Sequence, residues 1–313
     1  MRIVVAIDGD LLVPQNPNLG IAGQIAEITC VVDSIGDLLS SEHELVVTHG
    51  NAPQIGFMLL RAELASHVVH ALPLDVCGSD TQGATGYLLQ RTIRNWLHQH
   101  GFEAKEVATI VTQVLVEIAD PAFAHPARGI GPYYDQDKAR LYTGTRQWSF
   151  VLVPGRGYRR AVPSLKPRHV IEARTIADLL ATDTLVICAG GGGVPVYYDE
   201  HDNLVGADAV IDKAHTTSLL ATEVNAESII FVSLWDEVEL ILQMDLTSRR
   251  RQIARSELNE PMGRARDLDE GLYNKLLASQ SFLDHGGQSV LIAPPGHLGS
   301  DPECCRGLLI TND

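Results

Sequence analysis

The sequence has few basic residues for its length. Against 39 Asp and Glu residues it has 24 Lys and Arg, so its 313 residues carry a formal net charge of −15. Nucleic acids and anionic membrane surfaces are polyanions, so this balance argues against both as partners. A hydrophobic content of 45% is typical of a globular protein with one large or two modest cores.

Long apolar runs and a recognisable leader are also absent. No stretch of the sequence approaches the length that crosses a membrane. The chain begins directly with a strand-like segment, without the charged region, apolar region and cleavage site of a signal peptide. We therefore expect a cytoplasmic protein.

Cysteine is scarce and irregularly spaced. The five cysteines lack the spacing of a metal site, and an odd number cannot all pair within one chain. We expect reduced, mostly buried thiols. Cys304 and Cys305 are adjacent near the C-terminus, where a surface pair is favoured over a redox role.

Two common nucleotide motifs are missing, but three strand-like apolar runs end in glycine turns. Neither G-x-G-x-x-G nor G-x-x-x-x-G-K-[ST] occurs, which argues against ordinary dinucleotide and P-loop sites. Because ligands of open α/β sheets lie beyond the carboxyl ends of the strands, we expect the three turns to meet in one crevice. The runs and their turns are Arg2–Ile7 with Asp8-Gly9-Asp10, Glu44–Thr48 with His49-Gly50-Asn51, and Thr184–Cys188 with Ala189 and Gly190–Gly193.

The run Gly190–Gly193 is the strongest signal of a ligand site. Glycine leaves bare backbone, whose N–H groups can approach a phosphate or carboxylate closely. A tight turn would need only two glycines. We interpret the run as an anion-binding loop, with a simple strand-to-loop turn as the alternative.

Apolar residues recur at helical spacing in Gln24–Leu39, Ile55–Ala71 and Gly83–His100. Alternation of these segments with the strand-like runs predicts an α/β fold around a parallel sheet. Between Asp120 and Pro167 the composition shifts towards Pro, Gly, aromatic residues and Arg, which predicts an inserted flap. Thr247–Asp269 is highly charged, and we expect a mobile surface segment there, its Arg249–Arg251 triplet being a solvated face.

Several motifs follow one another in order over the first 230 residues. They are His49–Gly56, Asp80–Tyr87, Thr112–Val114, Asp120–Phe123, Gly129–Pro132, Tyr158–Pro163, Gly190–Gly193 and Ala209–Lys213. Together these segments resemble the motifs of the carbamate kinase family. The resemblance implies the amino-acid-kinase fold: a three-layer αβα arrangement around a doubly wound, mostly parallel sheet. It also implies a homodimer that transfers a phosphoryl group reversibly between ATP and carbamate, giving ADP and carbamoyl phosphate, with Mg²⁺ as the metal.

The resemblance divides the chain into two lobes. It implies an N-terminal substrate-binding lobe over residues 1–215, with a protruding subdomain at about 120–167 that corresponds to the flap. A C-terminal nucleotide-side lobe would then cover residues 216–313.

The family's site residues map onto three groups of positions. The catalytic residues that it implies are Lys213, Lys275 and Arg128, where Arg128 stands for a lysine that reaches the transferred phosphoryl group and keeps its positive charge. For phosphate or nucleotide it implies Gly9, Asp10, Gly190, Gly191, Gly192 and Gly193. For the small substrate it implies Gly50, Asn51 and Ala52. Arg159 and Arg160 could add positive charge. We assign no base role to His49, because phosphoryl transfer to an anionic nucleophile needs none.

Departures from the family pattern fall on the phosphate site. The first strand ends in Asp8-Gly9-Asp10 where the family has Gly-Gly-Asn, and Ala214 follows Lys213 where the family has an aspartate that organises two lysines. Glu270–Lys275 keeps only the lysine of the family's Gly-Ser-Met-x-Pro-Lys segment. Phe231–Glu237 lacks the family's Thr-Asp-Val pattern, and the terminal Gly-Thr turn has become Gly307-Leu308.

Asp8 is the departure with the largest electrostatic consequence. At an effective dielectric near 20, a carboxylate about 4 Å from a phosphate charge is repelled by roughly 4 kcal/mol. Two arrangements avoid this repulsion. Asp8 and Asp10 could hold a divalent cation between themselves and the phosphate, or Asp8 could replace the missing acid by pairing with Lys213.

Two functions of different classes follow from these residues. The first is a carbamate-kinase-like phosphotransferase with the same or an altered acceptor. The second is a catalytically degenerate homologue that keeps a small-anion pocket, binds nucleotide weakly and acts as a sensor or partner protein. An active transferase must tolerate Asp8 and Ala214.

Overall fold

An eight-stranded sheet forms the centre of the computed structural model, which describes residues 1–70, 72–242, 250–298 and 307–312. Six strands run parallel, whereas β17 is antiparallel to β16 and pairs in parallel with β15. The mostly parallel sheet is as predicted. Its order is β15 (Arg250–Ala254), β17 (Gly307–Thr311), β16 (Ser289–Ala293), β14 (Ser228–Val232), β1 (Arg2–Ile7), β2 (Glu44–His49), β10 (Thr184–Ile187) and β3 (Glu106–Thr109).

Helices cover both faces of this sheet, because its buried strands place alternate apolar side chains on opposite sides. In β1, Ile3, Val5 and Ile7 enter one core, and Val4 and Ala6 enter the other. The first core is closed by α1 (Gly20–Ser34), α2 (Gly36–Leu39) and α4 (Leu74–Gln99). The second is closed by α6 (Ala173–Leu180), α7 (Lys213–Glu223), α8 (Trp235–Leu242), α9 (Asn259–Leu268) and α10 (Glu270–Asp284).

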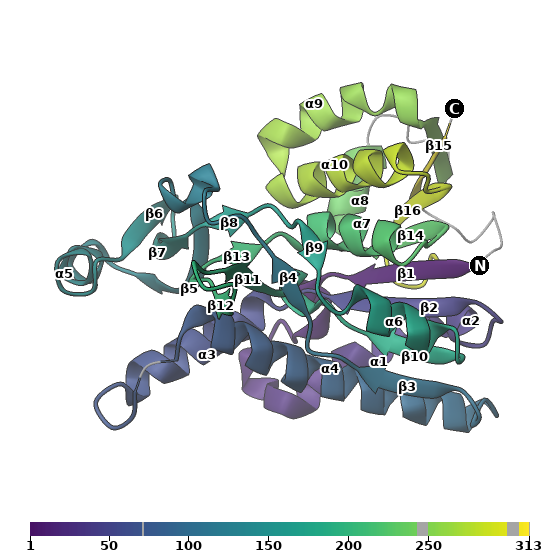
Figure 1. The fold of residues 1–313 in the computed structure, drawn as a ribbon, viewed down its shortest axis with the longest axis horizontal. Coiled ribbons are helices and arrows are strands. Elements are labelled where there is room, and N and C mark those ends of the chain that lie inside the picture. Colours follow the sequence, from purple (N-terminus) through teal and green to yellow (C-terminus); the bar gives the residue numbers. More distant parts are fainter. Residues whose placement is uncertain (71, 243–249, 299–306, 313) are drawn as a thin grey trace.

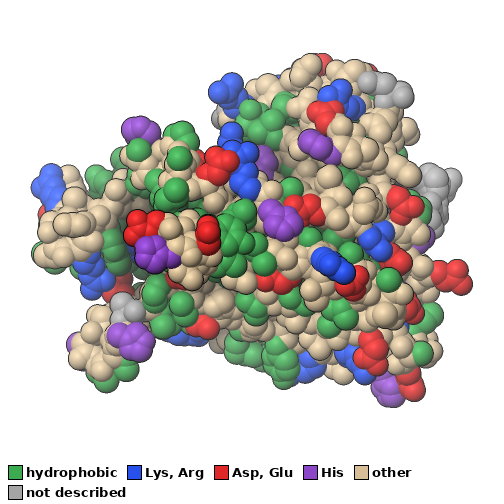
Figure 2. All heavy atoms as spheres, viewed as in Figure 1, with side chains coloured by type: hydrophobic (Ala, Val, Ile, Leu, Met, Phe, Trp, Pro, Cys, Tyr) green, Lys and Arg blue, Asp and Glu red, His purple; other side chains and the backbone are tan. Residues whose placement is uncertain are grey.

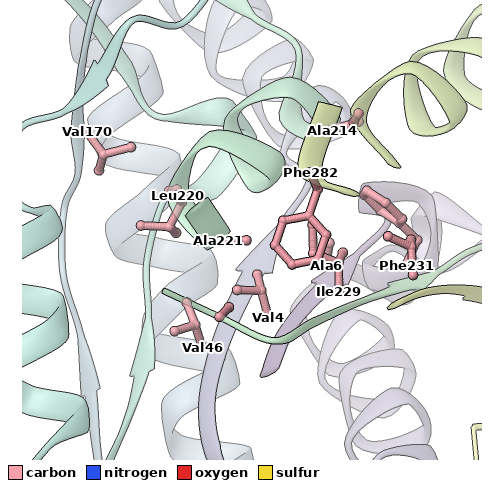
Figure 3. Packing of buried hydrophobic residues seen from close by; sticks show 14 of the residues in the cluster. Val4, Ala6, Val46, Val170, Ala214, Leu220, Ala221, Ile229, Phe231 and Phe282 are labelled. Atoms are coloured by element: carbon pink, nitrogen blue, oxygen red, sulfur yellow. The ribbon is translucent and has the colours of Figure 1, made fainter. Parts of the chain in front are cut away.

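Figure 3 shows part of the second core, where Phe231 of β14 and Phe282 of α10 lie beside Val4 and Ala6 of β1. Leu220 and Ala221 bring α7 to the same cluster. The three-layer αβα architecture is therefore confirmed.

A small antiparallel sheet and a helix project from this body at the left of Figure 1. Strands β5 (Arg128–Tyr134), β7 (Gly157–Val162) and β6 (Ser149–Val153) form the sheet, and α5 (Gln136–Arg146) lies at its tip. The projection falls within the segment predicted as an inserted flap, and we call it the flap. In Figure 1, β1 runs from the N-terminus towards it.

The flap is held to α3 (Ala52–Ala65) by apolar packing and by one carboxylate. Ile55 of α3 packs with Ile130 and Val162 of the flap. Glu63 accepts hydrogen bonds from the hydroxyls of Tyr134 and Tyr142 at 2.7 and 2.6 Å, and pairs with Lys138 at 2.9 Å.

Short strands join the flap to the main sheet. They form a four-stranded sheet in the order β12 (Leu204–Gly206), β11 (Val194–Tyr198), β4 (Gln113–Leu115) and β9 (His169–Val170), and a pair of β8 (Ser164–Leu165) with β13 (Val210–Ile211).

The helix boundaries differ from those predicted. The segment Gln24–Leu39 is divided into α1 and α2 at Ile35, and α3 begins at Ala52, three residues before its predicted start, and ends at Ala65. The largest difference is α4, which begins at Leu74 rather than Gly83. Its first turns are rich in Gly, Ser and Asp, so they lack the apolar periodicity that marks a helix in sequence.

The prediction of a mobile surface segment at Thr247–Asp269 is wrong for its described part. Arg250–Ala254 forms the edge strand β15, with Ile253 buried. Leu258, directly before α9, and Ala265 within α9 both lie in the core. Charged side chains suit an edge strand, which explains the polar sequence. Arg249, Cys304 and Cys305 lie outside the described residues.

Charges of both signs are interspersed on the face shown in Figure 2, without a continuous patch of either sign. No helix in the described part of the chain is long and apolar enough to cross a membrane.

Candidate active site

A cleft of about 470 Å³ lies between the flap, the carboxyl ends of β1 and β2, and the first turns of α7 and α10. Most of the residues predicted for the site line it. Of the four loop glycines only Gly191 does so. The predicted residues in its lining are Gly9, Asp10, Gly50, Asn51, Ala52, Arg128, Gly191, Lys213 and Lys275.

The turns after β1 and β2 touch backbone to backbone. A Cβ atom on Gly50 would lie 2.5 Å from the Gly9 nitrogen, and one on Gly9 would lie 3.0 Å from the Gly50 carbonyl carbon. Neither position has room for a side chain. The floor of the cleft is therefore main chain where these two strands end.

The glycine loop after β10 has a packing reason for each of its residues. Gly191, Gly192 and Gly193 have positive φ angles of 66°, 93° and 86°, which L side chains rarely adopt. A Cβ atom would also meet the His49 ring at Gly190 and the Asn51 amide at Gly191. Packing thus accounts for the loop as a tight turn, and Gly191 alone brings its backbone to the cleft.

Asp8 joins the two predicted catalytic lysines. The Nζ of Lys213, at the start of α7, donates to Oδ1 at 2.8 Å, and the Nζ of Lys275, in α10, donates to Oδ2 at 2.5 Å. Burial alone would raise the pKa of Asp8, but the two ammonium groups outweigh it and lower that pKa below its ordinary value. The sequence analysis left two arrangements open for Asp8, a cation site with Asp10 or a pair with Lys213. The structure has the pair with Lys213, and Asp8 binds Lys275 as well.

Glu237 is a site residue that the sequence analysis did not identify. It lies in the first turn of α8, and its Oε2 accepts a hydrogen bond from Lys275. Burial, with Asp8 nearby, raises the pKa of Glu237 despite the attraction of Lys275. Its only sequence signal was its place in the segment Phe231–Glu237, which departs from the family pattern.

The ammonium groups of Lys213 and Lys275 differ in how many of their N–H groups donate hydrogen bonds. An ammonium has three donors. Those of Lys275 go to Asp8, to Glu237 and to the Ser233 hydroxyl at 2.9 Å. Lys213 donates to Asp8 and to the Ile7 carbonyl oxygen at 2.9 Å, so among the described residues its third donor has no acceptor.

The start of α7 is fixed by a neighbouring acid. Asp212 caps the helix by accepting from the Ala214 N–H at 2.9 Å, and its other oxygen accepts from Asn274 of α10 at 3.0 Å. Ala214 is buried and offers the cleft only a methyl group. The acid that organises the lysines is therefore Asp8, directly after β1, and not a residue that follows Lys213.

Arg128 reaches the cleft from the flap and pairs with Glu270 of α10 at 3.0 Å. Arg159 also lines the cleft and donates to the Gly131 carbonyl oxygen at 3.1 Å. Arg160 does not line it and pairs with Asp208 at 2.7 Å. Of the two adjacent arginines, one adds positive charge to the site.

His49 is buried behind the cleft and is not placed as a base. Its Nδ1–H donates to the Gly50 carbonyl oxygen at 3.1 Å, and the residue is 1% exposed. Burial lowers the pKa of His49 to about 4, so the ring is neutral at physiological pH. Asn51 is held by Thr81, whose hydroxyl oxygen accepts from its amide at 2.8 Å.

Acidic groups slightly outnumber basic groups in the cleft. Its lining includes five carboxylates, on Asp8, Asp10, Asp212, Glu237 and Glu270, and four cationic side chains, on Arg128, Arg159, Lys213 and Lys275. The described residues contain no group of three or more His, Cys, Asp or Glu side chains that could hold a metal ion by themselves.

Comparisons with known proteins agree with this architecture. The sequence matches the amino acid kinase family over residues 1–294. It is 36% identical to a carbamate kinase-like protein, YahI, of Escherichia coli, over 97% of this chain and 96% of that protein. It is 35% identical to the carbamate kinase of Pyrococcus horikoshii, over 98% and 96%.

Among solved structures, carbamate kinase from Giardia lamblia bound to AMP-PNP superposes with a TM-score of 0.87 at 27% identity, covering 100% of this chain and 98% of that one. A protein from Aeropyrum pernix reaches 0.91 at 27% identity, with both chains fully covered. The fold, the paired lysines and these similarities agree: the chain belongs to the amino acid kinase family and, within it, to the carbamate kinase family.

Proposed function

We propose that the protein is a carbamate-kinase-like phosphotransferase, which transfers a phosphoryl group reversibly between ATP with carbamate and ADP with carbamoyl phosphate. The observation that carries this proposal is the bridge from Asp8 to Lys213 and Lys275. A carboxylate between two lysines keeps two positive charges together at the cleft, which their mutual repulsion would otherwise oppose.

Phosphoryl transfer depends on positioning and on stabilisation of negative charge more than on proton transfer. Lys213 has one N–H without an acceptor among the described residues, and it can offer this group to a phosphoryl oxygen. Arg128 can offer two parallel N–H groups from the flap. Gly50 and Asn51 would hold the small acceptor at the end of β2. Neutral His49 takes no proton in this scheme.

ATP and Mg²⁺ fit the charge of this cleft only together. Mg²⁺ usually binds through one or two carboxylates and the phosphates of its nucleotide. Both oxygens of Asp8 are engaged by lysines, so Asp10, exposed in the cleft lining, is the residue that would hold the ion. When bound, the metal supplies positive charge that offsets the phosphates and the surplus carboxylate.

The proposal extends to the two lobes and to the assembly. Residues 1–215 would bind the acceptor and residues 216–313 the nucleotide, in a homodimer.

The direct test is ATP formation from carbamoyl phosphate, ADP and MgCl₂, followed with a coupled enzyme assay. We expect turnover by the purified protein and a loss of roughly a hundredfold or more in Lys213→Met, which removes a charge at the transferring group. Equal rates for the two proteins would contradict the proposal.

A catalytically degenerate homologue remains the second candidate, and the acidic surplus of the cleft favours it. Such a protein would bind carbamoyl phosphate or another small anion without turnover. Calorimetry separates the two candidates, because micromolar ATP affinity together with turnover excludes the degenerate form.

A further inference from the structure

Two cationic groups of the cleft already have carboxylate partners from the C-terminal part of the chain. Lys275 donates to Glu237, and Arg128 pairs with Glu270. Both carboxylates lie in first turns of helices, Glu237 in α8 and Glu270 in α10. Each holds a position on its cation that an oxygen of a bound anion would otherwise take.

The contacts of Lys275 leave no donor for an incoming anion. Its three N–H groups go to Asp8, Ser233 and Glu237. Asp8 is bound through both oxygens by two lysines, and Ser233 is fully buried. An incoming anion can replace Glu237 at the lowest electrostatic cost. Glu237 pairs with Lys275, whereas displacing Asp8 would also remove the carboxylate that binds Lys213.

Glu270 is easier still to displace. Its side chain is 69% exposed, and that of Arg128 is 36% exposed. An exposed ion pair contributes little stability and is readily solvated. The pair also joins the flap to α10 across the cleft, so an anion that takes Arg128 from Glu270 would break a link between the two sides.

We propose that Glu237 and Glu270 are resident counter-anions, which neutralise Lys275 and Arg128 in the unliganded protein and are displaced by the phosphate of the ligand. They would thereby set the affinity of the cleft for anions. Ligands that bring two or more negative charges can replace them, whereas a monoanion such as chloride gains little. This inference rests on the proposed function, since it concerns the same site.

The test uses sulfate, a dianion whose charge is constant near neutral pH, as the probe. Calorimetry would measure its affinity for the wild-type protein and for Glu237→Gln and Glu270→Gln, which keep side-chain size and remove charge. We expect tighter binding by about tenfold for Glu237→Gln, whose carboxylate is largely buried, and by about threefold for Glu270→Gln. Glu260→Gln is the matched control: Glu260 pairs with Arg264 on the surface of α9 and should leave the affinity unchanged.

Unchanged or weaker sulfate binding in a folded Glu237→Gln protein would overturn the inference, because it would mean that Glu237 positions Lys275 instead of competing for it. Thermal melting without sulfate confirms that each variant is folded. Sulfate binding requires no turnover, so the outcome is independent of the kinase assay. Tighter sulfate binding by the variants of a protein that forms no ATP would support the role of the two glutamates as counter-anions and reject the proposed function. ATP formation together with unchanged or weaker sulfate binding by Glu237→Gln would support the proposed function and reject that role.

Discussion

The ammonium groups of Lys213 and Lys275 bind the two oxygens of a single carboxylate, that of Asp8. The family pattern implies an acid beside the first lysine, where this chain has Ala214. The acid is thus supplied by the residue that follows the central strand β1. This pairing reduces the electrostatic repulsion between Asp8 and a bound phosphate, because a carboxylate shared by two lysines repels an anion far less than an unpaired carboxylate does.

Asp8→Asn should destabilise the protein strongly, because two buried ammonium groups lose the charge that they share. Breaking a buried ion pair in this way typically costs about 3 to 5 kcal/mol of unfolding free energy. Urea unfolding would measure the loss. Asp10→Asn, two residues further on and exposed, should stay within about 0.5 kcal/mol of the wild type. Equal effects of the two changes would show that the bridge does not stabilise the fold.

Moving the acid back to its family position should repair part of this damage. Asp8→Gly alone should weaken both stability and sulfate binding, since Lys213 and Lys275 are left without the carboxylate between them. The double change of Asp8→Gly with Ala214→Asp should recover much of the loss. A double variant that is no better than Asp8→Gly would mean that position 214 cannot serve both lysines here.

Buried His49 should make stability depend on pH between about 4 and 6.5. Its pKa is lowered from 6.5 to about 4 in the folded protein, so within this range the unfolded chain binds the extra proton. Stability therefore falls as the pH falls, by roughly 3 kcal/mol in all. Denaturant unfolding at several pH values should show a smaller slope in His49→Gln. If the unfolding free energy depends on pH equally in both proteins, a group other than His49 causes the dependence.

The flap should loosen when Glu63 is changed. Glu63→Ala removes the acceptor of the Tyr134 and Tyr142 hydroxyls and the partner of Lys138. Hydrogen exchange of residues 136–146 should accelerate by about tenfold, corresponding to roughly 1.4 kcal/mol of local stability. Asp137→Asn, exposed on the same helix α5, is the control and should leave exchange in that helix unaltered.

Two glycine-to-alanine substitutions should change the stability of the protein in opposite directions. At Gly191, alanine would adopt a positive φ and crowd the Asn51 amide, so Gly191→Ala should destabilise by about 1 to 3 kcal/mol. At Gly263, inside α9 with open space around it, alanine should stabilise by about 0.5 to 1 kcal/mol. Thermal unfolding of the two variants gives the comparison, and a neutral Gly191→Ala would remove the packing explanation of that loop.

The strands around the cleft could be predicted from sequence because they are short apolar runs ended by glycine turns. Expected bounds for β1 agree with the structure, and those for β2 and β10 differ by one residue at the carboxyl end. The edge strand β15 could not be found in this way. Two of its five residues are arginines, which hide the strand pattern in the sequence, and its pairing with β17 makes it part of the sheet.

The family resemblance identified the lysines of the site but not all of their partners. Lys213 and Lys275 came from the family motifs, and pairing of Asp8 with Lys213 was one of two alternatives open for Asp8. Glu237 and Ser233 sit in a segment without a motif, and the fold alone brings them to Lys275. Local sequence carries no signal for a contact between residues 38 or more positions apart.

The place of β1 between β2 and β14 sets the order in which a ribosome can complete the protein. The first strand made must wait for residues 228–232 before its second neighbour exists. Of the two lysines that bind Asp8, Lys213 precedes that strand, 205 residues after Asp8, whereas Lys275 follows it, 267 residues after Asp8. Nascent chains that stop short of α10 therefore carry a carboxylate that lacks one of its two counter-charges, and the site closes only when the C-terminal helices have been synthesised.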